Sequence, residues 1–144
     1  MLKMVAMTLF AINLMIGCTA GPIKTNPLPY LGEPEKAAEV FVIREDTIYG
    51  GAFSSFIMVD DKEVFGIKYG EYTKFKLSSG KHTLGVKTYA LFGIPVIDTI
   101  EIDLAPKSKN HYFLSKSFQS ATIKRLQPQE GEALISKTTY IPFD

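Results

Sequence analysis

From residue 39 to the end of the chain, apolar residues occur in short segments separated by turn residues. The segments are rich in Val, Ile, Phe, Tyr and Thr, the residue types that strands favour. No stretch between them is long enough for the helices that connect parallel strands, so we predict a mainly β chain, a single antiparallel β-sandwich of about seven to eight strands. One short C-terminal helix is expected at residues 128–136, where Pro128 suits a first turn. The expected strands cover residues 40–44, 55–59, 62–67, 73–77, 82–89, 96–104, 111–117 and 121–126.

The fifth and sixth of these segments show most clearly which face is buried. Side chains in a strand alternate in direction, so Leu84 and Val86 lie on one face of the fifth segment. By the same rule, Ile100, Ile102 and Leu104 lie on one face of the sixth. We expect these five side chains in the core.

The N-terminal end has the pattern of a signal peptide. Lys3 is followed by residues 4–16, of which 11 of 13 are apolar and none is charged. Thirteen residues are too few to cross a hydrocarbon core, which needs about 20, but they fit the apolar core of a signal peptide. Residues 1–17 are therefore expected to be a signal peptide.

The end of this apolar run resembles the lipobox of bacterial lipoproteins. Leu14, Met15, Ile16 and Gly17 lead directly to Cys18, the only cysteine of the chain. Met15 stands where Leu is usual. The resemblance implies cleavage between Gly17 and Cys18 and attachment of lipid to the Cys18 thiol, which would hold the protein on a membrane. The alternative is that Cys18 is an ordinary apolar residue of the signal segment.

Removal of 17 residues leaves 127, with 15 basic and 15 acidic side chains. Residues 18–38 contain four of the eight prolines and predict an extended tether, about 60 Å long at roughly 3.1 Å per residue. Residues 39–144 then form the sandwich domain. Thr19 rather than Asp follows Cys18. By the same resemblance, this favours the periplasmic face of the outer membrane if the source has two membranes.

Composition and motifs exclude several classes of function. The net charge of +1 offers no basic surface for a nucleic-acid backbone. One cysteine supports neither a disulfide framework nor a thiolate zinc site. The chain contains no Gly-x-Ser-x-Gly, His-Glu-x-x-His or phosphate-loop motif. We therefore expect no nucleic-acid partner, no cofactor and no enzymatic activity.

The two histidines are weak candidates for a metal or acid–base site. His82 and His111 begin two expected strands, which would place them at the same end of the sandwich. Asp98 or Asp103 would complete such a site. The favoured interpretation is structural, because a histidine that opens a strand after a turn is usually bonded to a backbone carbonyl or packed under an aromatic ring.

Two loops are candidate partner contacts. Residues 89–97 are almost wholly apolar, so Leu91, Phe92 and Ile94 form either a buried corner or an exposed contact surface. Residues 48–53 place Tyr49 and Phe53 on either side of two glycines, in a flexible turn or a recognition loop.

The central stretch, residues 58–84, carries a second resemblance. It contains a turn at Asp60-Asp61-Lys62, then Val64-Phe65-Gly66, Gly70-Glu71-Tyr72 and Gly80-Lys81-His82-Thr83-Leu84. This order resembles a family of small bacterial envelope lipoprotein domains classed only as a domain of unknown function, similar in turn to PEGA-type β-sandwich modules. The resemblance spans about residues 39–135. It implies a fold and a location in the cell envelope, and no established activity.

These observations favour a lipid-anchored, non-enzymatic envelope module that contacts an envelope protein or a glycan. A small-ligand or metal-binding module using His82 and His111 is the alternative. An envelope hydrolase is a distant third, because the sequence shows no pairing of a nucleophile with a base.

Overall fold

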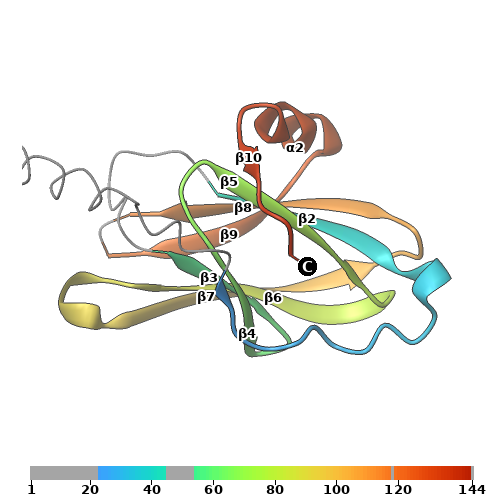
Figure 1. The fold of residues 1–144 in the computed structure, drawn as a ribbon, viewed down its shortest axis with the longest axis horizontal. Helices are drawn as coiled ribbons and strands as arrows, with labels where there is room; N and C mark the ends of the chain where they lie inside the picture. The colour runs from blue at the N-terminus through green and yellow to red at the C-terminus, as the bar shows by residue number, and fades with distance from the viewer. Residues whose placement is uncertain (1–22, 45–53, 118, 144) are drawn as a thin grey trace, which may run out of the picture.

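The computed structural model describes residues 23–44, 54–117 and 119–143, and in these residues ten strands form two five-stranded sheets packed face to face (Figure 1). Sheet A has the order β1-β4-β3-β6-β7, and sheet B the order β10-β5-β2-β8-β9. The helix α2 (Pro128–Ile135, red) lies on the outer face of sheet B. The strands of sheet A are β1 (Ile23–Lys24), β3 (Ser55–Val59), β4 (Lys62–Ile67), β6 (Gly80–Tyr89) and β7 (Pro95–Leu104). Those of sheet B are β2 (Ala38–Arg44), β5 (Glu71–Leu77), β8 (Lys109–Lys116), β9 (Ala121–Leu126) and β10 (Thr139–Tyr140).

All eight expected strands and the expected helix are confirmed, with ends that differ by two residues at most. The core lies between the sheets, and the five side chains predicted to face it do so. Leu84, Val86, Ile102 and Leu104 are buried, and Ile100 is partly buried against them. Burial of these side chains drives the packing of the two sheets.

Sheet B is mixed rather than purely antiparallel, which corrects one detail of the prediction. Strand β2 pairs in parallel with β8, and β10 pairs in parallel with β5. Strands β2 and β8 start side by side because their incoming chains are bonded to each other. The Glu39 amide donates to the Ser108 carbonyl at 2.8 Å, and the Lys107 amide to the Lys36 carbonyl at 3.2 Å.

The turn between β3 and β4 forms as its aspartates predict. Asp60 and Asp61 both have positive φ, 48° and 64°. A two-residue hairpin turn of type I′ needs positive φ at both positions, and Asp tolerates that conformation better than most residues. This turn places the Asp60 carboxylate at one end of the sandwich.

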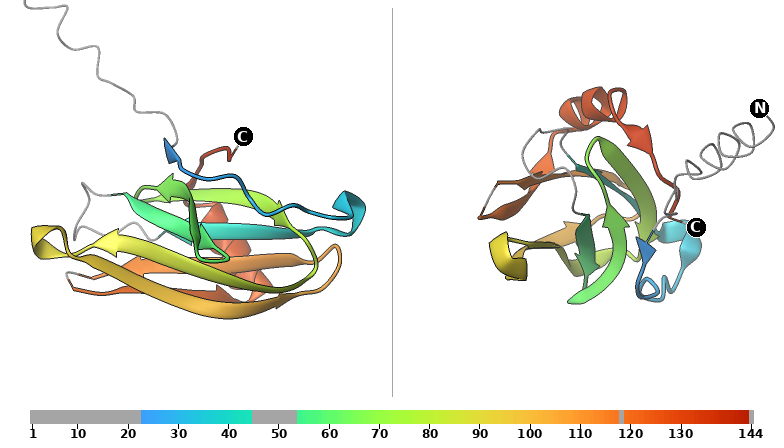
Figure 2. Two further views of the ribbon diagram at one scale, coloured as in Figure 1. Left: turned by 90° about the horizontal axis from the view of Figure 1, so that it is seen from below. Right: turned by 60° about the vertical axis from the view of Figure 1, so that its left-hand side comes forward.

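The expected tether is shorter than predicted, because most of it packs along the domain (Figure 2, left, blue). Strand β1 pairs with β4, the Asn26 side-chain amide donates to the Glu63 carbonyl at 2.7 Å, and Leu28 packs against the core. Farther along, residues 34–36 form a 3-10 turn. The prolines leave only short regular elements in this segment and do not prevent it from lying on the sandwich.

The gap between the edges of the two sheets is closed on one side of the sandwich, where β7 of sheet A meets β9 of sheet B. The Ile123 amide of β9 donates to a carboxylate oxygen of Asp98 in β7 at 2.9 Å. Asp98 therefore links the two sheets and takes no part in a histidine site.

Candidate functional site

The structure describes only some of the residues that the sequence singled out. Gly17, Cys18, Tyr49 and Phe53 lie outside the described residues. Leu91 is described for its backbone alone. The other candidates, in the β6–β7 hairpin and at the two histidines, have described side chains.

The tip of the β6–β7 hairpin is exposed, which decides between the two interpretations of residues 89–97. Phe92 is 91% exposed and Ile94 is 60% exposed. The tip is closed by two backbone bonds, from the Ala90 amide to the Ile94 carbonyl at 2.8 Å and from the Gly93 amide to the Ala90 carbonyl at 3.1 Å. Figure 2 shows this turn (yellow) at one end of the sandwich.

The conformation of Phe92 is unusual for a large side chain. Its φ is 63° and its ψ is 18°, in the left-handed region. Such a conformation is disfavoured for bulky residues and persists only where the surrounding structure imposes it. Here the two hydrogen bonds of the tip impose it and leave the phenyl ring in solvent.

The exposed apolar surface continues from the tip onto the outer face of sheet A. Ile97 is 53% exposed on this face. Beside it, the Phe56 and Tyr89 rings meet edge to face, with centroids 6.4 Å apart. At the far edge Ile23, which is 39% exposed, lies over Gly66. Four of the six large hydrophobic side chains that are exposed among the described residues therefore lie on the tip or on this face: Ile23, Phe92, Ile94 and Ile97.

Lys87 contributes a cation to the same face. Its ammonium group is paired with the Glu63 carboxylate and lies 5.6 Å from the centre of the Tyr89 ring. The hydrogen bond to Glu63 raises the pKa of Lys87 above its usual value. The lysine therefore stays charged at the base of the hairpin.

His82 lies in a hydrogen-bond network that sequence reasoning missed. Its Nδ1 is 2.9 Å from a carboxylate oxygen of Asp60, and its Nε2 is 3.1 Å from the Ser78 hydroxyl oxygen. The Asp60 carboxylate also accepts the Thr83 amide at 3.0 Å. This order of serine, histidine and carboxylate is the one that activates a nucleophile in serine hydrolases.

Two features favour a structural role for this network. Nε2 is also 3.0 Å from the Ser78 backbone carbonyl, so the ring edge already faces a backbone acceptor. The neighbouring hollow, about 430 Å³, is lined by His82, Asp60 and Asp103 among others, but not by Ser78. The imidazole thus ties the turn before β4 to the turn before β6, as expected for a histidine that opens a strand.

We expect the Asp60→Asn variant to lose less stability than the natural protein when the pH falls from 7 to 3. Partial burial raises the pKa of Asp60, but hydrogen bonds from His82 and Thr83 outweigh it and hold that pKa below its usual value. The carboxylate therefore stabilises the fold above the unfolded-state pKa of about 3.9, and this contribution is lost as the pH falls through the folded-state pKa. Urea unfolding at pH 7 and pH 3 measures the difference. Asp61→Asn, an exposed aspartate of the same turn, is the matched control, and an equal change in both variants contradicts the prediction.

His111 lies beneath α2. Its ring stacks on Phe41 with centroids 4.7 Å apart and an interplanar angle of 19°. Its Nε2 is 3.4 Å from a Glu132 carboxylate oxygen. Glycine at position 131 lets the helix approach, because a Cβ there would lie 2.3 Å from the imidazole Cγ. His111 therefore forms the contact between α2 and sheet B.

The structure does not bring the two histidines together, as the weaker alternative for them required. His82 alternates with Leu84 and Val86, so it faces the inner side of sheet A. His111 alternates with the core residues Tyr112 and Leu114, so it faces the outer side of sheet B. Sheet B lies between the two imidazoles. Among the described residues, no group of three or more His, Cys, Asp or Glu side chains is arranged to hold a metal.

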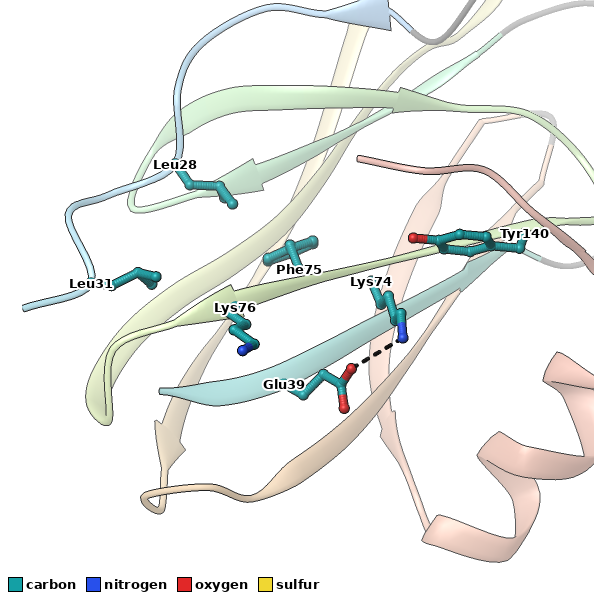
Figure 3. A pocket seen from close by; sticks show the side chains of 7 residues that line it. All are labelled: Leu28, Leu31, Glu39, Lys74, Phe75, Lys76 and Tyr140. Atoms are coloured by element: carbon teal, nitrogen blue, oxygen red, sulfur yellow. Dashed lines mark ion pairs between the residues drawn. The ribbon is translucent and has the colours of Figure 1, made fainter. Parts of the chain in front are cut away.

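A groove of about 470 Å³ runs between the N-terminal segment and sheet B (Figure 3). Leu28 and Leu31 form one wall, and Tyr140 lies at the other end. An ion pair between Lys74 and Glu39, 3.4 Å apart, spans the floor. Sequence reasoning missed this groove because the two leucines belong to the expected tether. The charges of Lys74 and Glu39 in this groove already neutralise each other.

Comparison with known proteins assigns the chain to no family. No protein-family model matches the chain, and a search of curated proteins finds no match. Within the part of the chain that the structure describes, no helix has the length and apolar character needed to cross a membrane.

Proposed function

We propose that this chain is a lipid-anchored protein of the bacterial cell envelope whose β-sandwich acts by contact and not by catalysis. The observation that carries the contact role is the hairpin tip, where Phe92 and Ile94, two residues apart in the sequence, are both exposed. Isolated exposed apolar residues are common, but a strained and exposed phenylalanine with a second exposed apolar residue in the same turn indicates a contact surface.

The lipid anchor is supported by the sequence alone. An apolar core of signal-peptide length ends at Gly17, and Cys18 follows. An anchor with two or more acyl chains binds a membrane stably, whereas a single chain binds only marginally. The location on the periplasmic face of an outer membrane is part of the same proposal, as is the likeness to envelope lipoprotein domains.

An envelope protein or a glycan is the partner that we expect from loops of this kind. Tyr49 and Phe53 belong to the same proposal and lie outside the described residues. The separation of His82 from His111 removes the observation that favoured a metal-binding function. The bonding of His82 to the Ser78 carbonyl weakens the hydrolase alternative.

Replacement of Cys18 by alanine tests the anchor. In bacteria fed a labelled fatty acid, the natural protein should carry the label and sediment with membranes, whereas Cys18→Ala should lose the label. The physical reason is that the thiol is the acceptor of the lipid, and no second cysteine can replace it. Thr19→Ala keeps the thiol and serves as the control. A Cys18→Ala protein that still carries the lipid label would contradict the proposed anchor on Cys18.

A further inference from the structure

The described chain begins, at Ile23 of β1, with its starting end facing the end of the sandwich that carries the hairpin tip. The pairing register aligns five residues in one row across sheet A: Ile23, Gly66, Phe56, Lys87 and Ile97. Strand β1 runs antiparallel to β4, β4 to β3, and β3 to β6. Strand β1 therefore runs opposite to β6. Because β6 runs towards the tip, the starting end of β1, at Ile23, is the end that faces the tip.

The chain between Cys18 and β1 is long enough to reach as far as the tip. Only four residues separate Cys18 from Ile23, so the two Cα atoms are at most about 18 Å apart. Phe92 follows Lys87 by five residues, which at about 3.3 Å per residue places it at most about 16 Å beyond the row. A membrane at the level of Cys18 is therefore within reach of Phe92.

The chemistry of the tip fits a lipid surface. Residues 90–97 contain no charged side chain. Tyr89 lies at the base of the tip, beside Lys87, and the Lys116 ammonium group donates to the Tyr89 carbonyl at 3.0 Å. Aromatic residues that join apolar and polar surroundings are enriched at membrane interfaces.

The tip's end of the sandwich also carries charge, at Lys68 and Glu71 at the turn between β4 and β5, but residues 90–97 of the hairpin carry none, and the turns at the opposite end differ from the hairpin. The turns at the opposite end carry the exposed charged side chains of Asp60, Asp61, Lys62 and Lys107. Charged turns of this kind favour water over lipid. The two ends together define one orientation, with the hairpin tip towards the membrane and the charged turns away from it.

We propose that the hairpin tip, with Phe92 and Ile94, docks into the surface of the bilayer that holds the lipid on Cys18. The inference rests on the proposed function, because the anchor sets the distance between domain and membrane. Docking gives the sandwich a fixed orientation, with strands β6 and β7 rising from the lipid surface. A protein or glycan partner at the tip is the competing occupant.

The experiment uses the full-length lipidated protein in vesicles of phosphatidylethanolamine and phosphatidylglycerol. Lipid on Cys18 leaves no free thiol, so a new cysteine accepts a polarity-sensitive fluorophore at one position. Ala90→Cys places the label in the hairpin without changing Phe92 or Ile94, and Lys62→Cys places it at the opposite end. The label at position 90 should enter an apolar environment and be quenched by nitroxides on the acyl chains, and the label at position 62 should not.

Phe92→Ser with Ile94→Ser, made together in the Ala90→Cys protein, should reduce the ratio of docked to undocked protein by about tenfold or more, because two apolar side chains lose their burial in lipid. An unchanged circular dichroism spectrum and thermal midpoint verify the fold. A label at position 90 that stays in water, on protein whose mass shows lipid on Cys18, overturns the docking and leaves the anchor intact. Capture of the tip by an added envelope protein or glycan, with no nitroxide quenching, also overturns it. Protein without lipid on Cys18 overturns the proposed function and this inference together.

Discussion

Replacement of Phe65 by alanine should lower the free energy of unfolding by about 3–5 kcal/mol, the largest effect that we expect from a single change. Phe65 is fully buried in β4. Its ring stacks on Phe143 with centroids 5.2 Å apart, and Phe143 in turn lies 5.4 Å from the Phe75 ring of β5. The substitution therefore opens a cavity where β4, β5 and the C-terminal segment meet, in addition to removing apolar burial.

Phe56→Ala is the matched control for this prediction. Phe56 has the same side chain in the neighbouring strand, but it lies half-buried on the outer face of sheet A. Its loss should lower the free energy of unfolding by only about 1 kcal/mol. Urea unfolding followed by circular dichroism measures both changes, since the chain has no tryptophan to report by fluorescence. Equal losses in the two variants would mean that the two faces of sheet A are buried alike.

Gly131→Ala should destabilise the protein by about 1–3 kcal/mol, although alanine is the better helix former by roughly 1 kcal/mol. An added Cβ would lie 2.3, 2.5 and 2.6 Å from three atoms of the His111 side chain. Contacts this short force α2 away from sheet B or the imidazole away from Phe41. The same urea titration measures the change.

A double-mutant cycle with His111→Gly isolates the cause, because glycine lacks all three of the side-chain atoms that the added Cβ would meet. Gly131→Ala should therefore become neutral or stabilising in that background. The coupling between the two positions then reports the steric contact directly. Additive effects of the two substitutions would show that the glycine is needed for another reason.

The strands and the helix were predictable because their signals are local. Alternation of apolar and polar residues marks the buried face of each strand, and Asp60-Asp61 or Ser78-Ser79-Gly80 marks a turn. The pairing of β2 with β8 was not predictable in this way. Alternation states which face a strand buries, but it does not state which strand lies beside it or in which direction.

The candidate site was predictable only in part. An apolar loop has the same sequence whether it is buried or exposed, so residues 89–97 needed the structure to show Phe92 and Ile94 in solvent. The opposite placement of the histidines left no clear signal, because β8 has the apolar residues Tyr112 and Leu114 on one face and Phe113 on the face of His111. His82 and Asp60, which are in contact, lie 22 residues apart in the sequence, and no local sequence pattern indicates this contact.

The parallel pairing of β2 with β8 affects how fast the chain can fold. Val40 pairs with Asn110, seventy residues later, so sheet B closes only when distant parts of the chain meet. Domains dominated by such distant pairings fold in about milliseconds to seconds, orders of magnitude more slowly than helical bundles. Until β8 is available, one edge of β2 lacks its native neighbour. Slow folding keeps the chain unfolded for longer. This topology would therefore suit a chain that is exported before it folds, as a lipidated envelope protein would be.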